Sequence, residues 1–141
     1  MKVREWMTAE PVTVTPDTTV AHARSLLDAR GVRHMPVVSP DGRVVGMLSD
    51  RDVAISDAML RSAVREHDVA GLLDDARTVD TVMSPAPQTI GMDAPIDDAA
   101  RVFVSRRINA LPVVDDGRLV GILTTTDCLL AVLRDDRLSY E

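Results

Sequence analysis

The chain contains one segment twice, and this internal repeat limits its possible folds more than any other feature of the sequence. At an offset of 76 positions, Met7, Pro11, Thr13, Asp17, Ala23, Arg30, Pro36, Val37 and Val38 recur as Met83, Pro87, Thr89, Asp93, Ala99, Arg106, Pro112, Val113 and Val114. After a one-residue deletion the offset is 75, and Asp41, Gly42, Arg43, Val45, Gly46, Leu48 and Asp52 recur as Asp116, Gly117, Arg118, Val120, Gly121, Leu123 and Asp127. A register kept over this length predicts two copies of one supersecondary unit.

Each copy begins with a short extended piece, at residues 12–15 and 88–91, and continues into a helix. The first helix is predicted from about Thr18 to Arg30, with Gly31 as its C-terminal cap. The second follows Pro95, which suits the first turn of a helix. The apolar residues at helical spacing are Val20, Ala23 and Leu27 in the first copy and Ile96, Ala99, Ala100 and Phe103 in the second.

A β-hairpin is predicted after each helix. Buried strands at residues 35–38 and 111–114 are each followed by an Asp-Gly pair and a second apolar run, at 44–48 and 119–123. Asp-Gly between two apolar runs is typical of a tight hairpin turn. A second helix then begins near Asp52 and near Asp127. Each unit is therefore predicted to be β-α-β-β-α.

The composition favours layers of helices and sheets. Hydrophobic residues make up 45% of the chain but aromatic residues only 2%, so aliphatic side chains must form the core. We expect an α/β (α+β) fold of two tandem, pseudo-twofold repeats. The first repeat with its N-terminal segment is expected in residues 1–65 and the second in 81–141. A helical connection is expected at 66–80, because the stretch 54–81 has one Gly and no Pro.

The charge and the cysteine content argue against several classes of protein. The net charge is −6 and the pI is near 5.0, so nucleic acid and anionic membrane surfaces are not expected partners. No apolar run approaches the roughly 18 residues that a membrane-spanning helix needs. The single Cys128 cannot form an intramolecular disulfide, and the first residues do not resemble a signal peptide. A cytoplasmic location is therefore expected.

The candidate chemistry lies where each hairpin meets its second helix. Residues 46–52 and 121–127 both read Gly, two apolar residues, a hydroxyl residue, two variable positions and Asp. The hydroxyl group and the free backbone N–H groups of a helix start can hold a phosphate. A carboxylate three residues later can accept both hydroxyl groups of a ribose. The alternative is that Ser49 and Thr124 only cap helices, with Asp52 and Asp127 complementing the helix dipole.

Taken together, these motifs resemble the CBS domain, named for cystathionine beta-synthase, and its paired arrangement, the Bateman module. The resemblance rests on residues 32–38 with 46–52 and on residues 108–114 with 121–127, and it spans nearly the whole chain. The length resembles small stand-alone bacterial CBS pairs.

The resemblance implies a cleft between the two CBS repeats with two sites for adenosine-containing ligands. It implies that the Asp binds ribose, that hydroxyl and basic residues bind phosphate, and that adenine lies against the segment before the Pro. It also implies that each site borrows residues from the other repeat. The first site would combine Arg33, His34, Ser49, Arg51 and Asp52 with Gln88, Ile108 and Asn109. The second would combine Asn109, Ala110, Thr124, Thr126 and Asp127 with Val12, Val32 and Arg33.

Charge distinguishes the two sites. Arg33, His34 and Arg51 surround Asp52, whereas the equivalent positions around Asp127 are Asn109, Ala110 and Thr126. Because the guanidinium group donates two parallel hydrogen bonds to phosphate, we expect AMP, ADP or ATP at the first site. S-adenosylmethionine is the less favoured ligand. The second site is expected to take a less charged adenosine compound or to stay empty. Alternatively, the two arginines are an ordinary solvated pair.

Metal and catalytic chemistry are not supported. His22, His34 and His67 have no metal-ligand spacing, so we expect no metal. Cys128 could have a lowered pKa at its helix start, but a packed thiol is the favoured interpretation. Ser49 is not in a Gly-x-Ser-x-Gly turn, and no phosphate loop with Lys occurs. A hydrolase or transferase that uses Asp50 and Asp52 would lack a nucleophile and base pair.

The expected function is therefore that of a regulatory module and not of an enzyme. Ligand occupancy is expected to change the angle between the repeats and to pass that change to a protein partner or to a second copy. The resemblance also implies a homodimer formed through helices. The alternative is a ligand-free CBS scaffold that only mediates dimerisation or partner binding.

Overall fold

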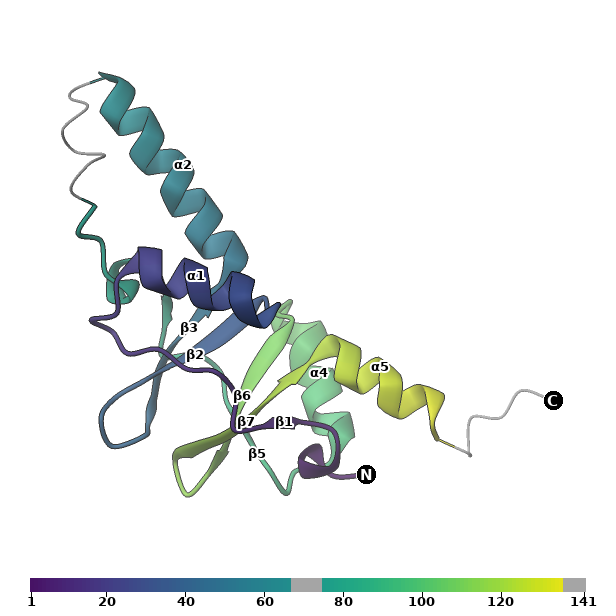
Figure 1. Ribbon diagram of the computed structural model, residues 1–141. Helices are drawn as coiled ribbons and strands as arrows, with labels where there is room; N and C mark the ends of the chain where they lie inside the picture. Colours follow the sequence, from purple (N-terminus) through teal and green to yellow (C-terminus); the bar gives the residue numbers. More distant parts are fainter. Residues whose placement is uncertain (67–74, 136–141) are drawn as a thin grey trace. The chain divides into compact units, whose positions relative to one another are not determined.

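The structure, a computed structural model, describes residues 1–66 and 75–135 and divides into two compact units (Figure 1). The repeat-1 unit is Val12–Ala86, and the repeat-2 unit is Met1–Pro11 together with Pro87–Glu141. Each unit contains one hairpin, its two helices and a short segment from the start of the other repeat.

The repeat-1 unit is a three-stranded antiparallel sheet with two helices. Its elements are α1 (Val20–Arg30), β2 (His34–Val38), β3 (Val44–Ser49), α2 (Asp50–Glu66), the 3-10 helix η2 (Val79–Thr81) and β4 (Ser84–Pro85). The strands are ordered β2-β3-β4. The extended piece before α1 contributes a single parallel bridge between Val14 and Val37.

The repeat-2 unit has the same plan with one more regular strand. Its elements are the 3-10 helix η1 (Val3–Glu5), β1 (Thr8–Ala9), β5 (Ile90–Gly91), α4 (Ile96–Arg106), β6 (Ala110–Asp115), β7 (Arg118–Thr124) and α5 (Thr125–Leu133). The sheet order is β1-β7-β6-β5, and only the β5–β6 pair is parallel. Both units therefore confirm the predicted mixed α/β fold. The β-α-β-β-α pattern is complete in the repeat-2 unit, whereas in the repeat-1 unit the first extended piece forms only the bridge at Val14.

Local capping explains where the first helix of each repeat begins and ends. The Thr19 side chain accepts a hydrogen bond from the His22 N–H and caps α1, which begins at Val20, two residues after the predicted start near Thr18. Gly31 adopts the left-handed conformation that was predicted, with φ 62°. Its counterpart Arg107 adopts the same conformation with φ 55°, a rare choice for a residue with a side chain.

The predicted hairpin turns are also confirmed. Gly42 and Gly117 both have positive φ angles, of 82° and 78°. In the second turn Asp116 is left-handed as well, with φ 51°, as a tight hairpin of the primed type requires.

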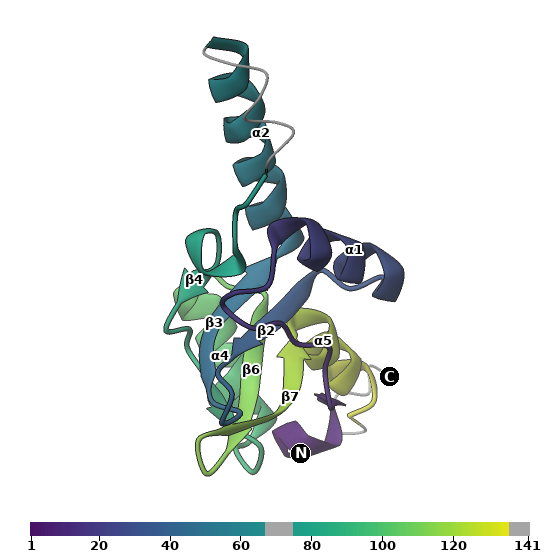
Figure 2. The ribbon, with the colours of Figure 1, turned by 60° about the vertical axis from the view of Figure 1, so that its left-hand side comes forward.

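The leading segments of the two repeats are exchanged between the hairpins. β1 comes from the start of the first repeat, yet it pairs with β7 in register Thr8↔Ile122. β4 comes from the start of the second repeat and pairs with β3 in register Met47↔Ser84. Figure 2 shows β4 beside β3. The repeat boundaries 1–65 and 81–141 stay predictions, but residues through Pro11 fold with the second repeat in space.

Each exchanged segment completes the core of the unit that receives it. Val3 and Val79 occupy equivalent places, and both are fully buried. The repeat-2 core consists of Val3, Ile90, Ile96, Ala99, Phe103, Leu111, Val113, Leu123 and Ala131. The repeat-1 core consists of Val14, Val20, Ala23, Leu27, Met35, Val37, Leu48, Val53 and Val79. Burial of these two valines supplies a hydrophobic driving force for the exchange.

The exchange also explains why a glycine recurs in each hairpin strand. A Cβ atom on Gly46 would lie 2.3 Å from Met83 Sδ, and one on Gly121 would lie 2.5 Å from Met7 Sδ. At Gly121 the added atom would also lie 3.0 Å from the backbone oxygen of Thr8. Glycine therefore lets the exchanged segment approach the strand closely.

The predicted helical connection is only partly helical. α2 extends as far as Glu66, and residues 67–74 lie outside the described residues. Residues 75–77 have no regular structure, and the chain resumes as the short 3-10 helix Val79–Thr81. The prediction was wrong for 75–77. There the Arg77 N–H donates to the Asp75 side chain at 3.2 Å, and the Arg77 carbonyl accepts from the Val20 N–H at the start of α1. Among the described helices, none combines the length and apolar character that crossing a membrane requires.

We predict that Gly121→Ala destabilises the protein by about 1–3 kcal/mol, because an added methyl group meets both a side chain and a backbone oxygen. Gly46→Ala should cost less, because the three atoms nearest to its added Cβ all belong to the flexible Met83 side chain. Gly91→Ala is the control, since nothing lies within 4 Å of its added Cβ. Urea unfolding of the three variants checks the order. An equal loss at Gly91 and Gly121 would contradict it.

Candidate ligand-binding site

The first candidate element is the junction between β3 and α2. The Ser49 N–H donates to Asp52 Oδ2 at 3.0 Å, and the Asp52 N–H donates to Ser49 Oγ at 3.0 Å. These reciprocal bonds form a capping box at the start of α2. Both side chains are half-buried.

The second candidate element repeats this geometry between β7 and α5. The Thr124 N–H donates to Asp127 Oδ2 at 2.8 Å, and the Asp127 N–H donates to Thr124 Oγ1 at 3.3 Å. The capping interpretation of Ser49 and Thr124 is therefore confirmed in both repeats. Capping uses only one oxygen of each carboxylate, because Oδ2 of each Asp takes part and Oδ1 does not.

The second carboxylate oxygen is what each element can offer to a ligand. Within the described parts of the chain, Oδ1 of Asp52 and Oδ1 of Asp127 accept no hydrogen bond. A half-buried carboxylate oxygen, already oriented by its partner oxygen, can accept a hydroxyl group of a ribose.

The hydroxyl groups of the two elements differ. Thr124 Oγ1 donates a hydrogen bond to Asp127 Oδ2 at 3.1 Å. Ser49 Oγ accepts a bond from the backbone of Asp52 and donates none to the residues that the structure describes. The Ser49 hydroxyl hydrogen can therefore serve a ligand acceptor such as a phosphate oxygen, whereas the Thr124 hydrogen is already used.

The backbone N–H groups at the helix start are less available than the sequence predicted. Besides the capping box, the Asp50 N–H donates to the backbone oxygen of Arg33 at 2.9 Å. The equivalent bond joins the Thr125 N–H to the oxygen of Asn109 at 3.1 Å. In the first element the N–H groups of Ser49, Asp50 and Asp52 are therefore used, and the Arg51 N–H is not part of these bonds. Any phosphate would thus depend on side chains more than on a ring of free N–H groups.

The same backbone bond brings the residues before each buried strand to the helix start. It holds Arg33 next to Asp50, and the β ladder pairs His34 with Ser49. Arg33 and Arg51 are exposed. The repeat-1 unit therefore gathers Arg33, His34, Ser49, Arg51 and Asp52 at one end of its hairpin, as predicted from the sequence.

His34 does not add the positive charge that the sequence suggested. Burial lowers the pKa of His34 below its usual 6.5 and outweighs the attraction of Asp50 and Asp52, while Arg33 lowers the pKa further. The imidazole is therefore mainly neutral near pH 7. The positive charge at this end of the hairpin belongs to the two arginines.

The repeat-2 unit gathers the corresponding residues around Asp127. Ala110 is buried and pairs with Thr124 in the β ladder, while Asn109 and Thr126 are exposed. No basic side chain occupies the positions that correspond to Arg33 and Arg51. This element is thus the less positive of the two, as the sequence predicted.

The remaining predicted residues belong to the opposite unit from the element they were assigned to. Gln88, which is exposed, and Ile108, which is half-buried, lie in the repeat-2 unit. Val12 and Val32, both half-buried, lie in the repeat-1 unit. Their contribution to a shared site stays a prediction.

Cys128 is a packed thiol. It contacts the repeat-2 core, and burial raises the pKa of the thiol, with a further increase from Asp127. The alternative of a lowered pKa at the start of α5 was wrong, because burial and the neighbouring carboxylate both favour the neutral thiol.

A family model described as the CBS domain matches the chain twice, at residues 3–58 and 79–134. The chain belongs to the CBS domain family. Both matched spans contain a complete capping-box element, so the two candidate elements are corresponding parts of two CBS domains. The resemblance seen in the sequence is therefore confirmed.

The CBS domain-containing protein CBSX1, chloroplastic, of Arabidopsis thaliana is 30% identical over an alignment of 141 positions, which covers 88% of this chain. The chain spans 60% of the length of that relative. The cytoplasmic location of this CBS protein stays a prediction.

Two solved structures of CBS proteins are similar to the chain and contain ligands. The crystal structure of CBSX2 in complex with AMP has a TM-score of 0.78 and 31% identity, and the match covers 94% of this chain and 96% of that one. The CBS domain pair of MJ0100 in complex with 5'-methylthioadenosine and S-adenosyl-L-methionine has a TM-score of 0.74 and 25% identity. That match covers 93% of this chain and 94% of the other.

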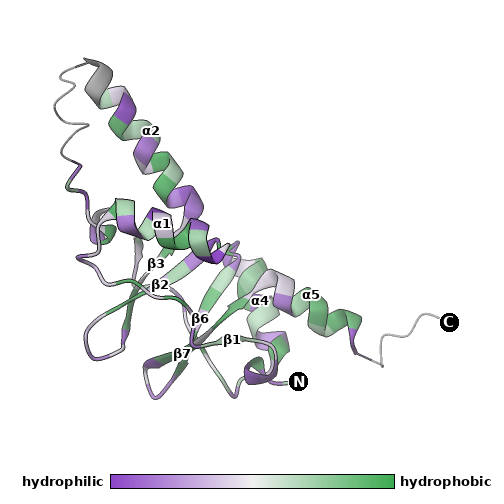
Figure 3. Ribbon diagram, in the orientation of Figure 1, coloured by the Kyte–Doolittle hydropathy of each residue, from purple (hydrophilic) through white to green (hydrophobic). Residues whose placement is uncertain are grey.

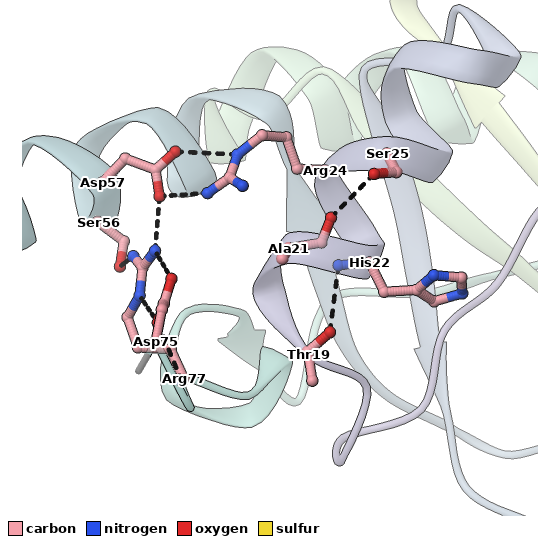
Figure 4. A network of polar contacts seen from close by, with 9 residues as sticks. All are labelled: Thr19, Ala21, His22, Arg24, Ser25, Ser56, Asp57, Asp75 and Arg77. Carbon is pink, nitrogen blue, oxygen red and sulfur yellow. Dashed lines mark hydrogen bonds and ion pairs between the residues drawn. The ribbon is translucent and has the colours of Figure 1, made fainter. Parts of the chain in front are cut away.

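Sequence reasoning missed a polar cluster in the first CBS domain that joins Arg24, Ser56, Asp57, Asp75 and Arg77 (Figure 4). Two of these residues lie in the stretch that was interpreted as a simple helical connection. The spacing of Asp75 and Arg77 is the only local signal, and it does not reveal the contact with α2 some 20 residues earlier.

We predict that His34 makes the protein less stable as the pH falls below about 6.5. Its pKa is lowered in the folded state, so the unfolded chain binds the proton more tightly. The contribution of the neutral His34 to the free energy of unfolding is fully present above the pKa of the unfolded chain. It is lost as the pH falls through the pKa of the folded state. In urea unfolding, His34→Gln should reduce the dependence of the free energy of unfolding on pH. The control His22→Gln, which removes an exposed histidine, should leave that dependence unchanged. A folded pKa at or above 6.5 by NMR titration would contradict the prediction.

Proposed function

We propose that this CBS protein is a regulatory module that binds an adenosine-containing ligand at the Ser49–Asp52 element. The observation that carries the proposal is the capping box, which orients the Asp52 carboxylate through Oδ2 and leaves Oδ1 for a ribose hydroxyl. The relatives support the same class of ligand, since AMP, 5'-methylthioadenosine and S-adenosyl-L-methionine all contain adenosine.

Each residue of the element has a proposed role. Asp52 Oδ1 accepts a ribose hydroxyl, and the Ser49 hydroxyl donates to a phosphate oxygen. Arg33 and Arg51 are exposed and supply the positive charge that a phosphate requires. His34 is neutral and provides a flat, partly buried surface beside the ligand. Gln88, Ile108 and Asn109 from the second CBS domain complete the site in this proposal, as the sequence predicts.

AMP, ADP or ATP is the proposed ligand of the first element, with S-adenosylmethionine less favoured. The reason is charge: two arginines flank Asp52, and a phosphate group offers both of them an anionic partner, whereas S-adenosylmethionine has one carboxylate and adds a sulfonium cation. The Asp127 element lacks these arginines, and its hydroxyl hydrogen is already bonded to the carboxylate. We propose that it takes a less charged adenosine compound or stays empty.

The proposed output is regulatory. A ligand that contacts residues of both CBS domains binds one arrangement of the domains better than another, and so shifts the population toward it. A partner protein or a second copy of the chain would read that shift. Catalysis is not proposed, because the hydroxyl residue and the Asp of each element are engaged with each other in a helix-capping box.

A homodimer is part of the proposal, and exposed apolar side chains on the helices support it. On α5, Leu129 and Leu133 are 64% and 80% exposed, and Val104 on α4 is 80% exposed. On α2, Ile55 and Met59 are 50% and 69% exposed. Figure 3 shows the hydrophobic colouring along α5. The same surfaces support the second candidate function, a scaffold that dimerises or binds a partner without a ligand.

We predict that Asp52→Ala weakens AMP binding by at least roughly tenfold, because it removes a charged hydrogen-bond acceptor. Asp127→Ala is the matched control, since it removes the same capping box from the other CBS domain and should leave AMP affinity near that of the parent. Titration calorimetry measures both affinities, after a thermal-shift panel of AMP, ADP, ATP, GMP and S-adenosylmethionine on the parent.

The two alternatives give different results in this experiment. If the parent binds AMP and Asp52→Ala binds it equally well, the assignment of the site is wrong. If no adenosine compound binds the parent, the scaffold function is supported instead. Nucleotide turnover by the purified chain would contradict a purely regulatory role.

We predict that a Leu129→Glu, Leu133→Glu double variant is monomeric where the parent is a dimer, because it places charge on the apolar surface of α5. Arg118→Glu, an exposed change in the same CBS domain, should leave the dimer intact. Sedimentation velocity distinguishes the two states. A dimer that persists in the leucine variant would exclude this surface of α5 from the interface.

A further inference from the structure

The polar cluster of the first CBS domain joins three separate segments of the chain (Figure 4). Arg24 lies on α1, Ser56 and Asp57 lie on α2, and Asp75 and Arg77 lie on the segment that leads into the exchanged strand β4. We call these five residues the α2 clamp. All of them belong to the repeat-1 unit.

Asp57 is held from two sides. Arg24 donates to it through Nε at 3.1 Å and through Nη2 at 2.6 Å, a two-point contact between α1 and α2. Arg77 donates to Asp57 Oδ1 through Nη2 at 2.7 Å. The Asp57 side chain is only 18% exposed, so water screens these contacts less than it screens a surface ion pair.

Arg77 uses the rest of its guanidinium group as well. It donates to Ser56 Oγ at 2.6 Å and to the two oxygens of Asp75 at 2.8 Å and 2.7 Å. The planar fork of one arginine therefore fixes the second turn of α2 and the segment at residues 75–77 at once. A lysine, with a single point of charge, could not make these contacts together.

The charges of the α2 clamp stabilise one another. The hydrogen bond from Arg77 lowers the pKa of Asp75 to about 2. Burial raises the pKa of Asp57, but the hydrogen bonds from Arg24 and Arg77 outweigh it, so the pKa is lowered. Both carboxylates are therefore ionised at neutral pH, and the contacts are charge-assisted.

The backbone of Arg77 links the clamp to the start of α1. The Val20 N–H donates to the Arg77 oxygen at 3.0 Å, and the Val79 N–H donates to the oxygen of Thr18 at 2.8 Å. From Arg77 the chain continues through Met83, which packs on Gly46, to β4 on the edge of β3. β3 ends at Ser49, the first residue of the Ser49–Asp52 element.

The second CBS domain repeats the backbone contact but not the clamp. The Ile96 N–H donates to the backbone oxygen of Met1 at 2.9 Å, as Val20 does to Arg77. In the repeat register, however, Arg24, Asp57 and Arg77 correspond to Ala100, Val132 and Met1. None of these three can form an ion pair through its side chain. The two domains therefore share the backbone contact, and they differ in whether the clamp is present.

We propose that Arg77 and Asp57 are positioning residues for the ligand site at Asp52. Ser56 lies four residues after Asp52, so both occupy one face of α2 on successive turns. By holding Ser56 and Asp57, the clamp fixes the rotation of α2 about its axis and with it the direction of Asp52 Oδ1 and Arg51. This inference rests on the proposed function, and it adds a second reason, besides charge, why the first site binds the ligand.

A clamp that only stabilised the fold would behave differently from a positioning clamp. Loss of a purely structural contact lowers the melting temperature but leaves the affinity unchanged while the protein is fully folded. Loss of a positioning contact weakens binding even where circular dichroism shows complete folding. Ligand affinity well below the melting transition therefore separates the two roles.

The test compares AMP binding to Arg77→Met, Asp57→Asn and the parent by titration calorimetry, at a temperature well below every melting transition. We expect each single variant to lose roughly tenfold in affinity, the size of a typical coupling between sites. The double variant should lose no more than either single one, because both changes open the same clamp. The matched control is Arg101→Met, which breaks the exposed 3.2 Å pair with Asp98 on α4 and should change nothing.

Arg77→Lys is included in case Arg77→Met does not fold. It keeps the positive charge but lacks the planar guanidinium group that makes several hydrogen bonds at once. It should bind AMP with an affinity between those of the parent and of Arg77→Met. If the parent binds AMP and the folded clamp variants bind it equally tightly, only the positioning inference is wrong. If the parent binds no adenosine compound, the proposed function is wrong and the positioning role falls with it.

Discussion

Pairing of a short leading segment with the hairpin of the other repeat is the contact on which both CBS domains depend. β1 and β4 are two residues long, yet each covers the edge of a hairpin strand, and the 3-10 helix before each of them places a fully buried valine in the core. An uncovered strand edge would expose unpaired backbone groups and invite association with other chains. The methionine contacts at Gly46 and Gly121 follow from this exchange, since only glycine allows the approach.

In each candidate element one side chain caps a helix and also has an oxygen atom that is available for the proposed ligand. Oδ2 of Asp52 completes a capping box, which satisfies backbone groups that a helix start leaves unpaired. The same bond orients the carboxylate, so Oδ1 is presented without the entropy loss of ordering it when a ligand arrives. The structural and functional interpretations of this motif are therefore not alternatives.

The two units share one backbone plan, and they differ in side chains that this plan does not require. Arg33 and Arg51 supply positive charge at the first element only. The α2 clamp contacts α2, and the corresponding helix α5 has no such clamp. His34 corresponds to Ala110 of the second repeat and is a titratable group beside the first element, although burial keeps it mainly neutral near pH 7. Two elements of similar backbone geometry therefore differ in charge, which is the basis of the proposed difference in ligand preference.

The repeat, the hairpins, the glycine cap of α1 and the buried stripes could all be predicted, because turn geometry and hydrophobic periodicity depend on neighbouring residues. The grouping of Arg33 with Asp52 could be predicted as well, since hairpin register brings them together. The exchange of Thr8–Ala9 and the contact between Arg77 and Asp57 could not. They join residues far apart in the chain, and burial, edge pairing and charge complementarity select such partners only once the chain has folded.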